Sequence, residues 1–264
     1  MPSAFAIETM VSDSRSQKQQ GHENIIFPDQ LSVGREITLE GNLFASLLAR
    51  EPFPGEIITV LDNTGRTFRG RITELKVDQA SVSLFEEITG PTEPPFDLVL
   101  FQALPAKERM ELIVQKTTEL GVKGIVPFKS RHSISLEERE ATQPKAHRWQ
   151  HIALKAAKQC RRGVVPIIAP YCSFAAALEQ ARPAEVKIIL WEKEQTSLAR
   201  LLRSRPRPPS IALMVGPEGG WAEEEIEQAQ EKGFVAVNLG GRILRTETAA
   251  IAVCAILQYA WEGL

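Results

Sequence analysis

The sequence lacks the two glycine patterns that mark the commonest nucleotide-binding sites. Neither Gly-x-Gly-x-x-Gly nor Gly-x-x-x-x-Gly-Lys-Ser/Thr occurs anywhere in the 264 residues. The first pattern cradles the pyrophosphate of a dinucleotide, and the second cradles the phosphates of a nucleoside triphosphate. Their absence disfavours a classical dinucleotide or nucleoside-triphosphate site.

Cysteine is scarce as well, and the positions of the cysteines disfavour both a metal site and a set of disulfide bonds. Cys160, Cys172 and Cys254 fit neither the spacing of a metal site nor a disulfide framework. Free thiols suit a reducing compartment, so we expect a cytoplasmic protein that needs no metal. The chain does not start with a charged segment followed by an apolar stretch, so we expect no signal peptide. Its longest nearly apolar run, residues 249–261, is too short to span a bilayer.

The chain has no global excess of positive charge. Its formal net charge is −2, and its hydrophobic fraction of 43% and charged fraction of 24% are those of a soluble globular protein. A large positive net charge would have indicated that the protein binds nucleic acid over much of its surface. Here any surface for nucleic acid must be local.

One local basic segment stands out. Residues 141–178 contain no Asp or Glu, although they hold several Lys and Arg. Arg148, Lys155 and Arg162 recur every seven residues, which predicts that they share one face of a helix over residues 144–162. We interpret this face as an RNA-binding surface whose affinity should fall steeply with salt. The alternative is a solvated face balanced by acidic side chains from elsewhere in the chain.

The first ninety residues differ in kind from the rest. Residues 1–22 are polar and rich in Ser and Gln, so we expect a disordered tail. Short runs typical of strands then occur at residues 36–39, 56–61, 67–75 and 80–86. Closely spaced short strands predict a small β-barrel over residues 23–90. The Gly/Pro-rich residues 90–95 are interpreted as a linker.

After the linker, strand patterns alternate with helix patterns. Strands are predicted at residues 96–103, 124–128, 186–191, 211–215 and 234–239. Helices are predicted at residues 107–120, 144–162, 223–232 and 247–261. Strands that alternate with helices predict an α/β fold with a parallel sheet.

Two glycine loops follow two of these strands within one strand–helix–strand unit. Residues 216–220 read GPEGG after the first strand, and residues 239–246 read LGGRILRT after the second. Glycine lets main-chain groups approach a ligand closely. In open α/β sheets, ligands bind beside such loops at the carboxyl ends of the strands. A single loop of this kind would indicate only a tight turn, but two loops with charged neighbours favour a ligand site.

The residues of this segment carry a resemblance to a known family. GPEGG, followed after an amphipathic helix by LGGRILRTETA, resembles the C-terminal signature of the RsmE family. These are bacterial 16S rRNA uridine-N3 methyltransferases of the SPOUT (trefoil-knot) superfamily. The helix that ends in Thr118-Glu119-Leu120-Gly121 and the segment Gln159-Cys160-Arg161-Arg162 are similar to further family motifs.

The resemblance implies a fold, a cofactor and partners. It implies a PUA-like, RNA-binding β-barrel over residues 23–90 and a SPOUT methyltransferase domain over residues 91–264, whose last segments thread into a trefoil knot. It also implies S-adenosylmethionine as cofactor, 16S rRNA or the small ribosomal subunit as substrate, and a homodimer with the apolar helix 249–261 at its interface.

The resemblance also implies site residues by position. The cofactor site would comprise Leu190, Gly216, Gly220, Leu239, Gly240, Arg242, Ile243, Leu244 and Arg245. Arg50 resembles an arginine of the family's barrel and is expected to contact RNA with Arg148, Lys155 and Arg162. Two departures are visible: Arg131-His132 replaces a Glu-Arg pair, and Trp221-Ala222 lacks the usual hydroxyl residue that caps a helix.

The expected chemistry singles out an arginine and a carboxylate. Uracil N3 carries a proton, so its methylation requires removal of that proton or stabilisation of the N3 anion. Arg245 is the first candidate for stabilising the negative charge that develops on the base. The sequence does not identify the base: Glu218, which is taken with Arg245 as a catalytic candidate, Glu119 and Glu247 all remain possible.

Two alternative functions remain open from the sequence. One is a SPOUT enzyme that methylates the ribose 2′-hydroxyl instead of the base. The other is a non-catalytic RNA-binding assembly factor that uses only the barrel and the basic helix. The intact glycine loops at residues 216–220 and 239–246 argue against the second alternative.

Overall fold

The computed structural model describes residues 23–106, 109–135, 137–138 and 149–263. The tail expected over residues 1–22 and the candidate Arg148 lie outside the described residues. The chain forms two compact units. We call the described residues of 94–153 and 166–264 the sheet unit, and those of 11–93 and 154–165 the barrel unit. In the part of the chain that the structure describes, no helix is long and apolar enough to cross a membrane.

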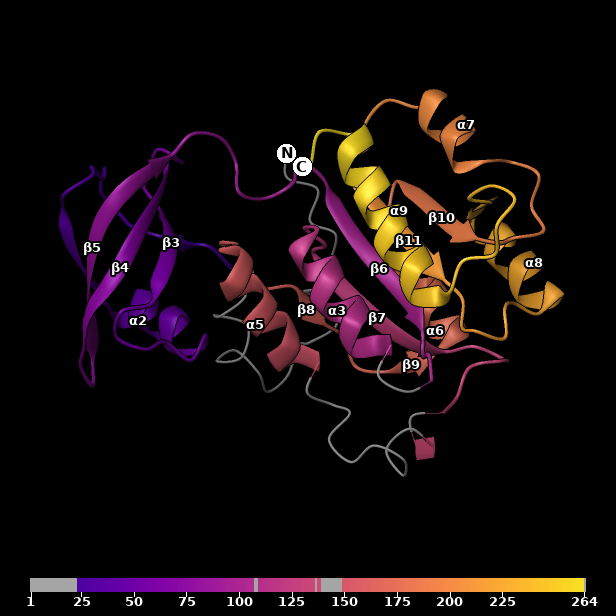
Figure 1. Cartoon of the computed structure of the whole chain (residues 1–264), viewed down its shortest axis with the longest axis horizontal. Coiled ribbons are helices and arrows are strands. Elements are labelled where there is room, and N and C mark those ends of the chain that lie inside the picture. The colour runs from indigo at the N-terminus through magenta and orange to yellow at the C-terminus, as the bar shows by residue number, and fades with distance from the viewer. Residues whose placement is uncertain (1–22, 107–108, 136, 139–148, 264) are drawn as a thin grey trace. The chain divides into compact units, whose positions relative to one another are not determined.

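The barrel unit contains a curled, mostly antiparallel sheet with one covering helix (Figure 1). Its strands are β1 (Ile25–Ile26), β2 (Glu36–Glu40), β3 (Ile57–Leu61), β4 (Thr67–Leu75) and β5 (Gln79–Ile88), and its helix is α2 (Gly41–Leu48). The strand order is β1-β3-β4-β5-β2, and only the β1–β3 pair is parallel. The strands predicted from residue 36 onward are confirmed, while β1 and α2 were not predicted.

The core of the barrel unit follows from alternation along its strands. In β5 the side chains of Ala80, Val82 and Leu84 are buried at every second position, because successive residues of a strand point to opposite faces. Gly70 of β4 faces this row, and a Cβ there would stand 2.4 Å from Cγ1 of Val82. Glycine is therefore required at this position, where the β4–β5 pairing is also irregular.

The sheet unit is built on one parallel sheet. Its strands are β6 (Asp97–Ala103), β7 (Gly124–Lys129), β8 (Ile167–Ile168), β9 (Cys172–Ser173), β10 (Val186–Leu190), β11 (Ser210–Val215) and β12 (Val235–Val237). The order is β12-β10-β11-β6-β7-β8, with β9 also paired to β7. The central strands β6 and β11 are buried along almost their whole length, which explains their continuous apolar runs.

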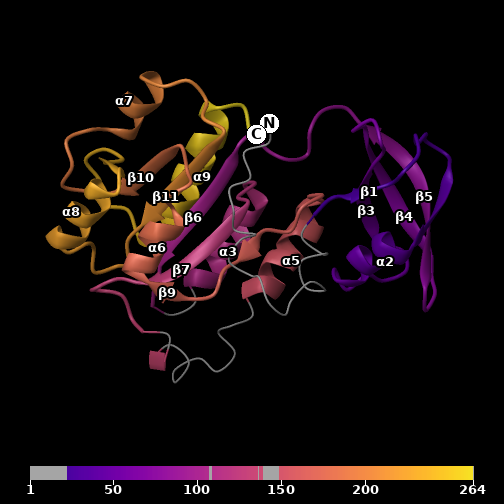
Figure 2. The same cartoon turned by 180° about the vertical axis from the view of Figure 1, so that it is seen from behind.

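Helices cover both faces of this sheet (Figures 1 and 2). They are α3 (Arg109–Glu119), α6 (Phe174–Gln180), α7 (Leu198–Arg203), α8 (Glu223–Glu231) and α9 (Thr246–Ala260), whereas α5 (Trp149–Cys160) begins in the sheet unit and ends in the barrel unit. Buried side chains of α3, α7 and α9 share one core cluster, and those of α6 and α8 share the cluster on the opposite face. The alternation of strands and helices predicted from the sequence is confirmed, although the short elements β8, β9, α6 and α7 were not predicted.

The helix predicted over residues 144–162 ends earlier than expected. Helix α5 stops at Cys160, and Arg161 adopts a left-handed φ of 61°. The main-chain N–H of Arg162 then donates to the carbonyl oxygen of Ala157, which closes the last turn. Arg162 therefore lies beyond the helix, and the prediction that it continues the helical face of Lys155 is wrong.

Candidate functional site

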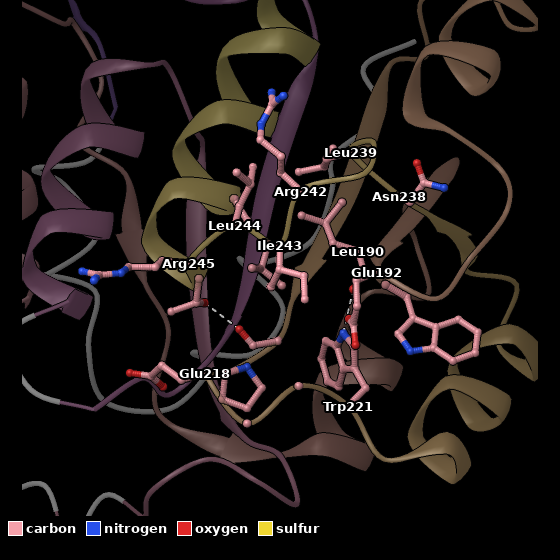
Figure 3. A pocket seen from close by; sticks show the side chains of 18 of the residues that line it. Leu190, Glu192, Glu218, Trp221, Asn238, Leu239, Arg242, Ile243, Leu244 and Arg245 are labelled. Atoms are coloured by element: carbon pink, nitrogen blue, oxygen red, sulfur yellow. Dashed lines mark hydrogen bonds between the residues drawn. The ribbon is translucent and has the colours of Figure 1, made fainter.

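A cavity of about 490 Å³ lies where β10, β11 and β12 end (Figure 3). The three strands are parallel neighbours, so their carboxyl ends meet at one edge of the sheet. All the residues expected in the cofactor site line this cavity, together with the candidate base: Leu190, Gly216, Glu218, Gly220, Leu239, Gly240, Arg242, Ile243, Leu244 and Arg245. Three segments far apart in sequence therefore build one cavity within the sheet unit.

The first glycine loop, residues 216–220, is a tight turn after β11. The N–H of Gly220 donates to the carbonyl oxygen of Pro217 at 3.1 Å, and Gly220 has a φ of +70°. A Cβ at Gly216 would stand 3.0 Å from the indole ring of Trp221. Conformation thus favours glycine at position 220, whereas close packing favours it at position 216.

Trp221 ties this loop to the end of β10. Its Nε1–H donates to the carbonyl oxygen of Leu190 at 2.7 Å, and its ring stacks on that of Phe128 with centroids 6.1 Å apart. The indole is buried, which makes an unpaired N–H costly and the hydrogen bond a firm constraint. In the sequence, Trp221-Ala222 was notable only because it lacks the hydroxyl residue that usually caps the following helix. Helix α8 indeed has no side-chain cap at Ala222.

The second glycine loop is held by Asn238, which the sequence analysis did not single out. The N–H of Asn238 donates to Thr196, its carbonyl oxygen accepts from Leu198, and its side-chain oxygen accepts from Gly240 at 3.0 Å. Gly240 has a φ of +100°, and a Cβ there would meet no atom within 4 Å. The loop is therefore shaped by main-chain bonds, with open space where a ligand can approach.

A buried hydroxyl links the two loops through the start of α9. Thr246 Oγ1 donates to the carbonyl oxygen of Gly216 at 2.6 Å and accepts from Nε2 of Gln102 at 3.0 Å. Gln102 is wholly buried at the end of β6 and also donates to the carbonyl oxygen of Ala103. This chain of bonds fixes the first loop against β6 and α9 at once.

Arg109 is the main charged residue of the site that the sequence analysis missed. It pairs with the carboxylate of Glu218, and its Nε lies 3.6 Å from Oε2 of Glu247. Glu218 Oε1 also accepts from the N–H of Ala106 at 2.9 Å. Two of the three candidate bases therefore meet at one guanidinium. Arg109 lies in the helix predicted over residues 107–120, but no pattern in the sequence indicated this arrangement.

Glu119, the third candidate base, lies outside the cavity, whereas the candidate arginine Arg245 lines it. Glu119 pairs with Lys116 at 2.9 Å near the end of α3 and does not line the cavity. Arg245 is exposed and immediately precedes α9. Figure 3 shows its guanidinium directed away from Leu239, on the side of the cavity where Glu218 lies. The arrangement brings Arg245 and Glu218 to the same cavity and leaves Glu119 out.

The comparison with protein families matches the part of the chain that builds this cavity. A family model described as an RNA methyltransferase domain matches residues 92–258. This match covers more than half of the chain.

The chain belongs to the RNA methyltransferase family.

Relatives within this family are similar over most of their length. The chain is 34% identical to the ribosomal RNA small subunit methyltransferase E of Mesomycoplasma hyopneumoniae over 180 residues, which are 68% of this chain and 77% of that protein. It is 29% identical to the enzyme of the same name from Bacillus subtilis over 215 residues, or 80% and 84% of the two chains.

Two solved structures of the same kind share the fold. One is a ribosomal RNA small subunit methyltransferase E from Neisseria gonorrhoeae bound to S-adenosyl methionine, with 36% identity, coverage of 91% and 98% of the two chains, and a TM-score of 0.64. The other is a Legionella pneumophila protein titled a putative methyltransferase in complex with the same cofactor, with 30% identity, coverage of 89% and 96%, and a TM-score of 0.63. The SPOUT-like α/β fold and the PUA-like barrel implied by the resemblance are confirmed.

The described residues expected to contact RNA differ in exposure: Arg50 and Arg162 are buried, and Lys155 is exposed. Arg50 is buried, and its guanidinium donates to the carbonyl oxygens of Glu23 and Gly163. Burial lowers the pKa of Arg50 to about 10, although Glu93 and Glu56 oppose the shift. Arg50 therefore joins parts of the barrel unit to one another and presents no free cation at its surface.

The basic segment of residues 154–165 is partly neutralised by distant acids. Nζ of Lys158 lies 3.1 Å from Oε1 of Glu56, and NH2 of Arg162 lies 2.6 Å from Oε2 of Glu93. The side chain of Arg162 is only 6% exposed, whereas Lys155 is exposed. For Lys158 and Arg162 the structure favours the alternative in which acidic side chains from elsewhere balance the charge. Lys155 keeps the position expected of an RNA contact.

Proposed function

We propose that this protein is an S-adenosylmethionine-dependent methyltransferase that modifies N3 of one uridine in the 16S rRNA of the small ribosomal subunit. One observation carries the proposal: two glycine loops and the end of β10 enclose a single cavity in a chain of the RNA methyltransferase family. The relatives named above are ribosomal RNA small subunit methyltransferases, and two similar structures are titled as holding this cofactor.

The residues of the cavity fit the cofactor. Its volume of about 490 Å³ suits a ligand of this size, because small-molecule pockets span roughly 300–1,000 Å³. Leu190, Leu239 and Leu244 offer an apolar surface for a planar base, and the glycine loops offer main-chain donors and acceptors. The carboxylate of Glu192 also lines the cavity and suits a cationic ligand. When bound, S-adenosylmethionine supplies an electrophilic methyl group on a positively charged sulfur.

The protein's own groups would act on the uracil ring. Loss of the N3 proton leaves negative charge on the ring and its two carbonyl oxygens. The planar guanidinium of Arg245 would donate to one of these oxygens and stabilise the charge as it develops. In the structure Glu218 is bound to Arg109 and to the N–H of Ala106. We infer that it accepts the N3 proton after exchanging Arg109 for the substrate.

The homodimer expected from the resemblance has a matching surface on α9. Ile256 and Tyr259 are 41% and 83% exposed on this helix, and Leu112 of the adjoining α3 is 42% exposed. Large exposed apolar side chains on neighbouring helices are typical of a surface that meets a partner. We infer that a second copy of the chain covers it. Sedimentation of wild type and of Tyr259→Asp tests this, because a monomeric wild type would contradict the inference.

The barrel unit, with a domain boundary near residue 90, is proposed to hold RNA while the sheet unit carries out the chemistry. The compact units divide at residue 93 and also place residues 154–165 with the barrel, so the exposed Lys155 belongs to the unit proposed to bind RNA. We propose that a protein acting on small-subunit rRNA functions in the cytoplasm.

Mapping of rRNA methylation by mass spectrometry tests the proposed function. The 16S rRNA of cells with and without this protein is digested and compared, and purified protein is then added back to the unmodified rRNA. A 3-methyluridine that appears only with the protein supports the proposal. A methyl group on ribose would identify the 2′-hydroxyl as acceptor. No new modification, together with intact rRNA binding, would identify a non-catalytic assembly factor.

A further inference from the structure

A second basic segment lies in α7 and in the loop that leads to β11. Residues 195–217 contain no Asp or Glu, while Arg200, Arg203, Arg205 and Arg207 all fall within eight residues. All four side chains belong to exposed residues. Because the whole chain has a net charge of −2, four cations in so short a segment without an acid among the neighbouring residues are a marked local departure.

Acidic residues from elsewhere in the described chain do little to neutralise this segment. Among the described residues, only Arg207 of the four has a carboxylate within 4.0 Å. Its partner Glu262 lies at 3.5 Å, and the side chain of Glu262 is 88% exposed. Exposed ion pairs of this kind contribute little to stability because solvent screens both charges. The contrast with Lys158 and Arg162 is direct, since those two cations do meet acids from distant parts of the chain.

The segment is anchored at both ends, so its arginines project from a fixed backbone. Ser204 ends α7 by donating its hydroxyl to the carbonyl oxygen of Leu201 at 2.8 Å. At the other end Pro208 is buried, and the carbonyl oxygen of Pro209 accepts from the N–H of Asp97 at 2.9 Å. Prolines at 206, 208 and 209 fix φ along the loop. A backbone held in this way loses less conformational entropy when a ligand binds.

The segment runs from beside the cavity, where the N–H of Leu198 donates to the carbonyl oxygen of Asn238, to the opposite end of the sheet. Residue 209 immediately precedes β11, whereas Gly216 of the first glycine loop follows the last residue of that strand. Six residues of strand separate the two, or about 20 Å at roughly 3.3 Å per residue. Figures 1 and 2 likewise show α7 toward the top of the view and α8, which follows the first glycine loop, lower down. Arg205 and Arg207 of the loop therefore lie far from the cofactor cavity, and none of the four arginines lines it.

We propose that Arg200, Arg203, Arg205 and Arg207 form a phosphate-binding surface that holds rRNA away from the reacting nucleotide. Guanidinium groups match phosphate geometry through paired donors, and exposed clusters of arginine are typical of a surface that binds a nucleic-acid backbone. The inference rests on the proposed function. The inference adds a statement about the substrate. The bound RNA must reach about 20 Å beyond the cavity, so it is a folded region of rRNA and not a single nucleotide.

The salt dependence of rRNA binding tests the proposal. Affinity for transcribed 16S rRNA is measured between about 50 and 200 mM salt for wild type and for the variant R203Q/R205Q/R207Q. Each lost phosphate contact should reduce the slope of log K against log salt by roughly 0.7–0.9, so we expect a slope shallower by about 2. Cofactor affinity and thermal midpoint, measured beside it, should stay at wild-type values because the three substituted side chains are exposed and do not line the cavity.

The matched control is K76Q/K193Q/K232Q. It removes the same number of charges from exposed lysines that are each paired with a glutamate, namely Glu74, Glu223 and Glu179. Its slope should stay close to that of wild type. An equal change of slope in both variants would show a general charge effect and overturn the proposal.

The remaining outcomes separate this inference from the proposed function. An unchanged slope and affinity in the arginine variant overturn the inference while leaving methylation intact. An unchanged slope on naked rRNA with weakened binding to small subunits would assign the surface to an acidic protein and overturn it as well. Wild-type protein that binds 16S rRNA through these arginines but never methylates it would contradict the proposed function alone.

Discussion

The hydroxyl of Thr246 donates to the carbonyl oxygen of Gly216 at 2.6 Å, across thirty residues of sequence. The bond joins the first residue of α9 to the first glycine loop, and the buried amide of Gln102 donates to the same hydroxyl. The two loops that line the cavity are thus fixed relative to each other by one side chain that is itself buried. Cofactor affinity should therefore depend on a residue whose main role is positioning.

Thr246→Val should loosen the cavity without changing its shape. Valine keeps the volume of threonine but removes the hydroxyl donor to the Gly216 carbonyl and one of the acceptors of the Gln102 amide, which costs about 1–3 kcal/mol. We expect a lower melting temperature and a weaker affinity for S-adenosylmethionine, measured by calorimetry. Thr246→Ser keeps the hydroxyl and serves as the control. Equal losses in both variants would show that the methyl group, and not the hydrogen bond, matters.

Gly220→Val and Gly240→Val should abolish cofactor binding while the fold survives. Both glycines have positive φ, a conformation that β-branched residues rarely adopt, and both line the cavity. Gly65→Val is the matched control, because Gly65 has a φ of 84°, lies in the barrel unit and has open space around its Cβ position. Calorimetric titration with S-adenosylmethionine should show binding only in the control. Wild-type affinity in the two cavity variants would mean that the cofactor binds elsewhere.

Arg245→Lys should reduce turnover far more than ligand affinity. A lysine retains the charge but loses the planar pair of donors that suits a carbonyl oxygen. If Arg245 acts on the charge that develops on the base, kcat should fall on the order of 10²-fold, the effect of losing one such donor. Single-turnover methylation beside a melting curve measures both properties. Arg182→Lys, an exposed arginine that does not line the cavity, is the control. Normal turnover in a stable Arg245→Lys protein would exclude this role.

Arg162 and Lys155 should respond differently to substitution by alanine. Arg162→Ala leaves the largely buried carboxylate of Glu93 without its cation, so the barrel unit should lose on the order of 3 kcal/mol of stability. Lys155→Ala removes an exposed charge and should leave the melting temperature unchanged. It should instead make rRNA binding less dependent on salt. Thermal melts and salt titrations of both variants decide the matter; a destabilised Lys155→Ala would contradict the assignment.

Asp62 should make the stability of the barrel unit depend on acidic pH. Burial alone would raise the pKa of Asp62, but hydrogen bonds from Thr64, Leu31 and Arg66 hold it well below its usual range. Because the folded pKa is depressed, the stabilisation is present above the ordinary Asp pKa of about 3.9 and is lost as pH falls below it. Melting temperatures of wild type should therefore drop between about pH 4 and pH 2. Asp62→Asn should melt lower at neutral pH and show a flatter pH profile.

Local patterns predicted most of the regular structure correctly. The continuous apolar runs of β6 and β11 and the alternation in β5 are set by which faces of each strand are buried, so they are visible in the sequence. The shortest elements were missed because this kind of prediction needs a periodic pattern. Strands β8 and β9 have two residues each, too few to show any periodicity.

The sequence by itself determined the elements of the candidate site. The two glycine loops, the strand end at Leu190 and the arginine at 245 could all be located from the residues, because each depends on local backbone needs or on a recognisable motif. The structure brings them around one cavity. Which side chains complete that cavity, such as Arg109 and Asn238, depended on contacts between distant segments and was not visible in any local pattern.

Only the tertiary structure decided which charges are free. Residues 141–178 contain no acid, and the sequence therefore suggested an uncompensated basic face. In the folded barrel unit, Glu56 and Glu93 reach Lys158 and Arg162 from 102 and 69 positions away. An ion pair forms wherever folding brings opposite charges within a few ångströms, and the distance along the chain sets no limit on it. The arginines of α7 and its following loop, equally basic in sequence, meet no such partners apart from Glu262 among the described residues.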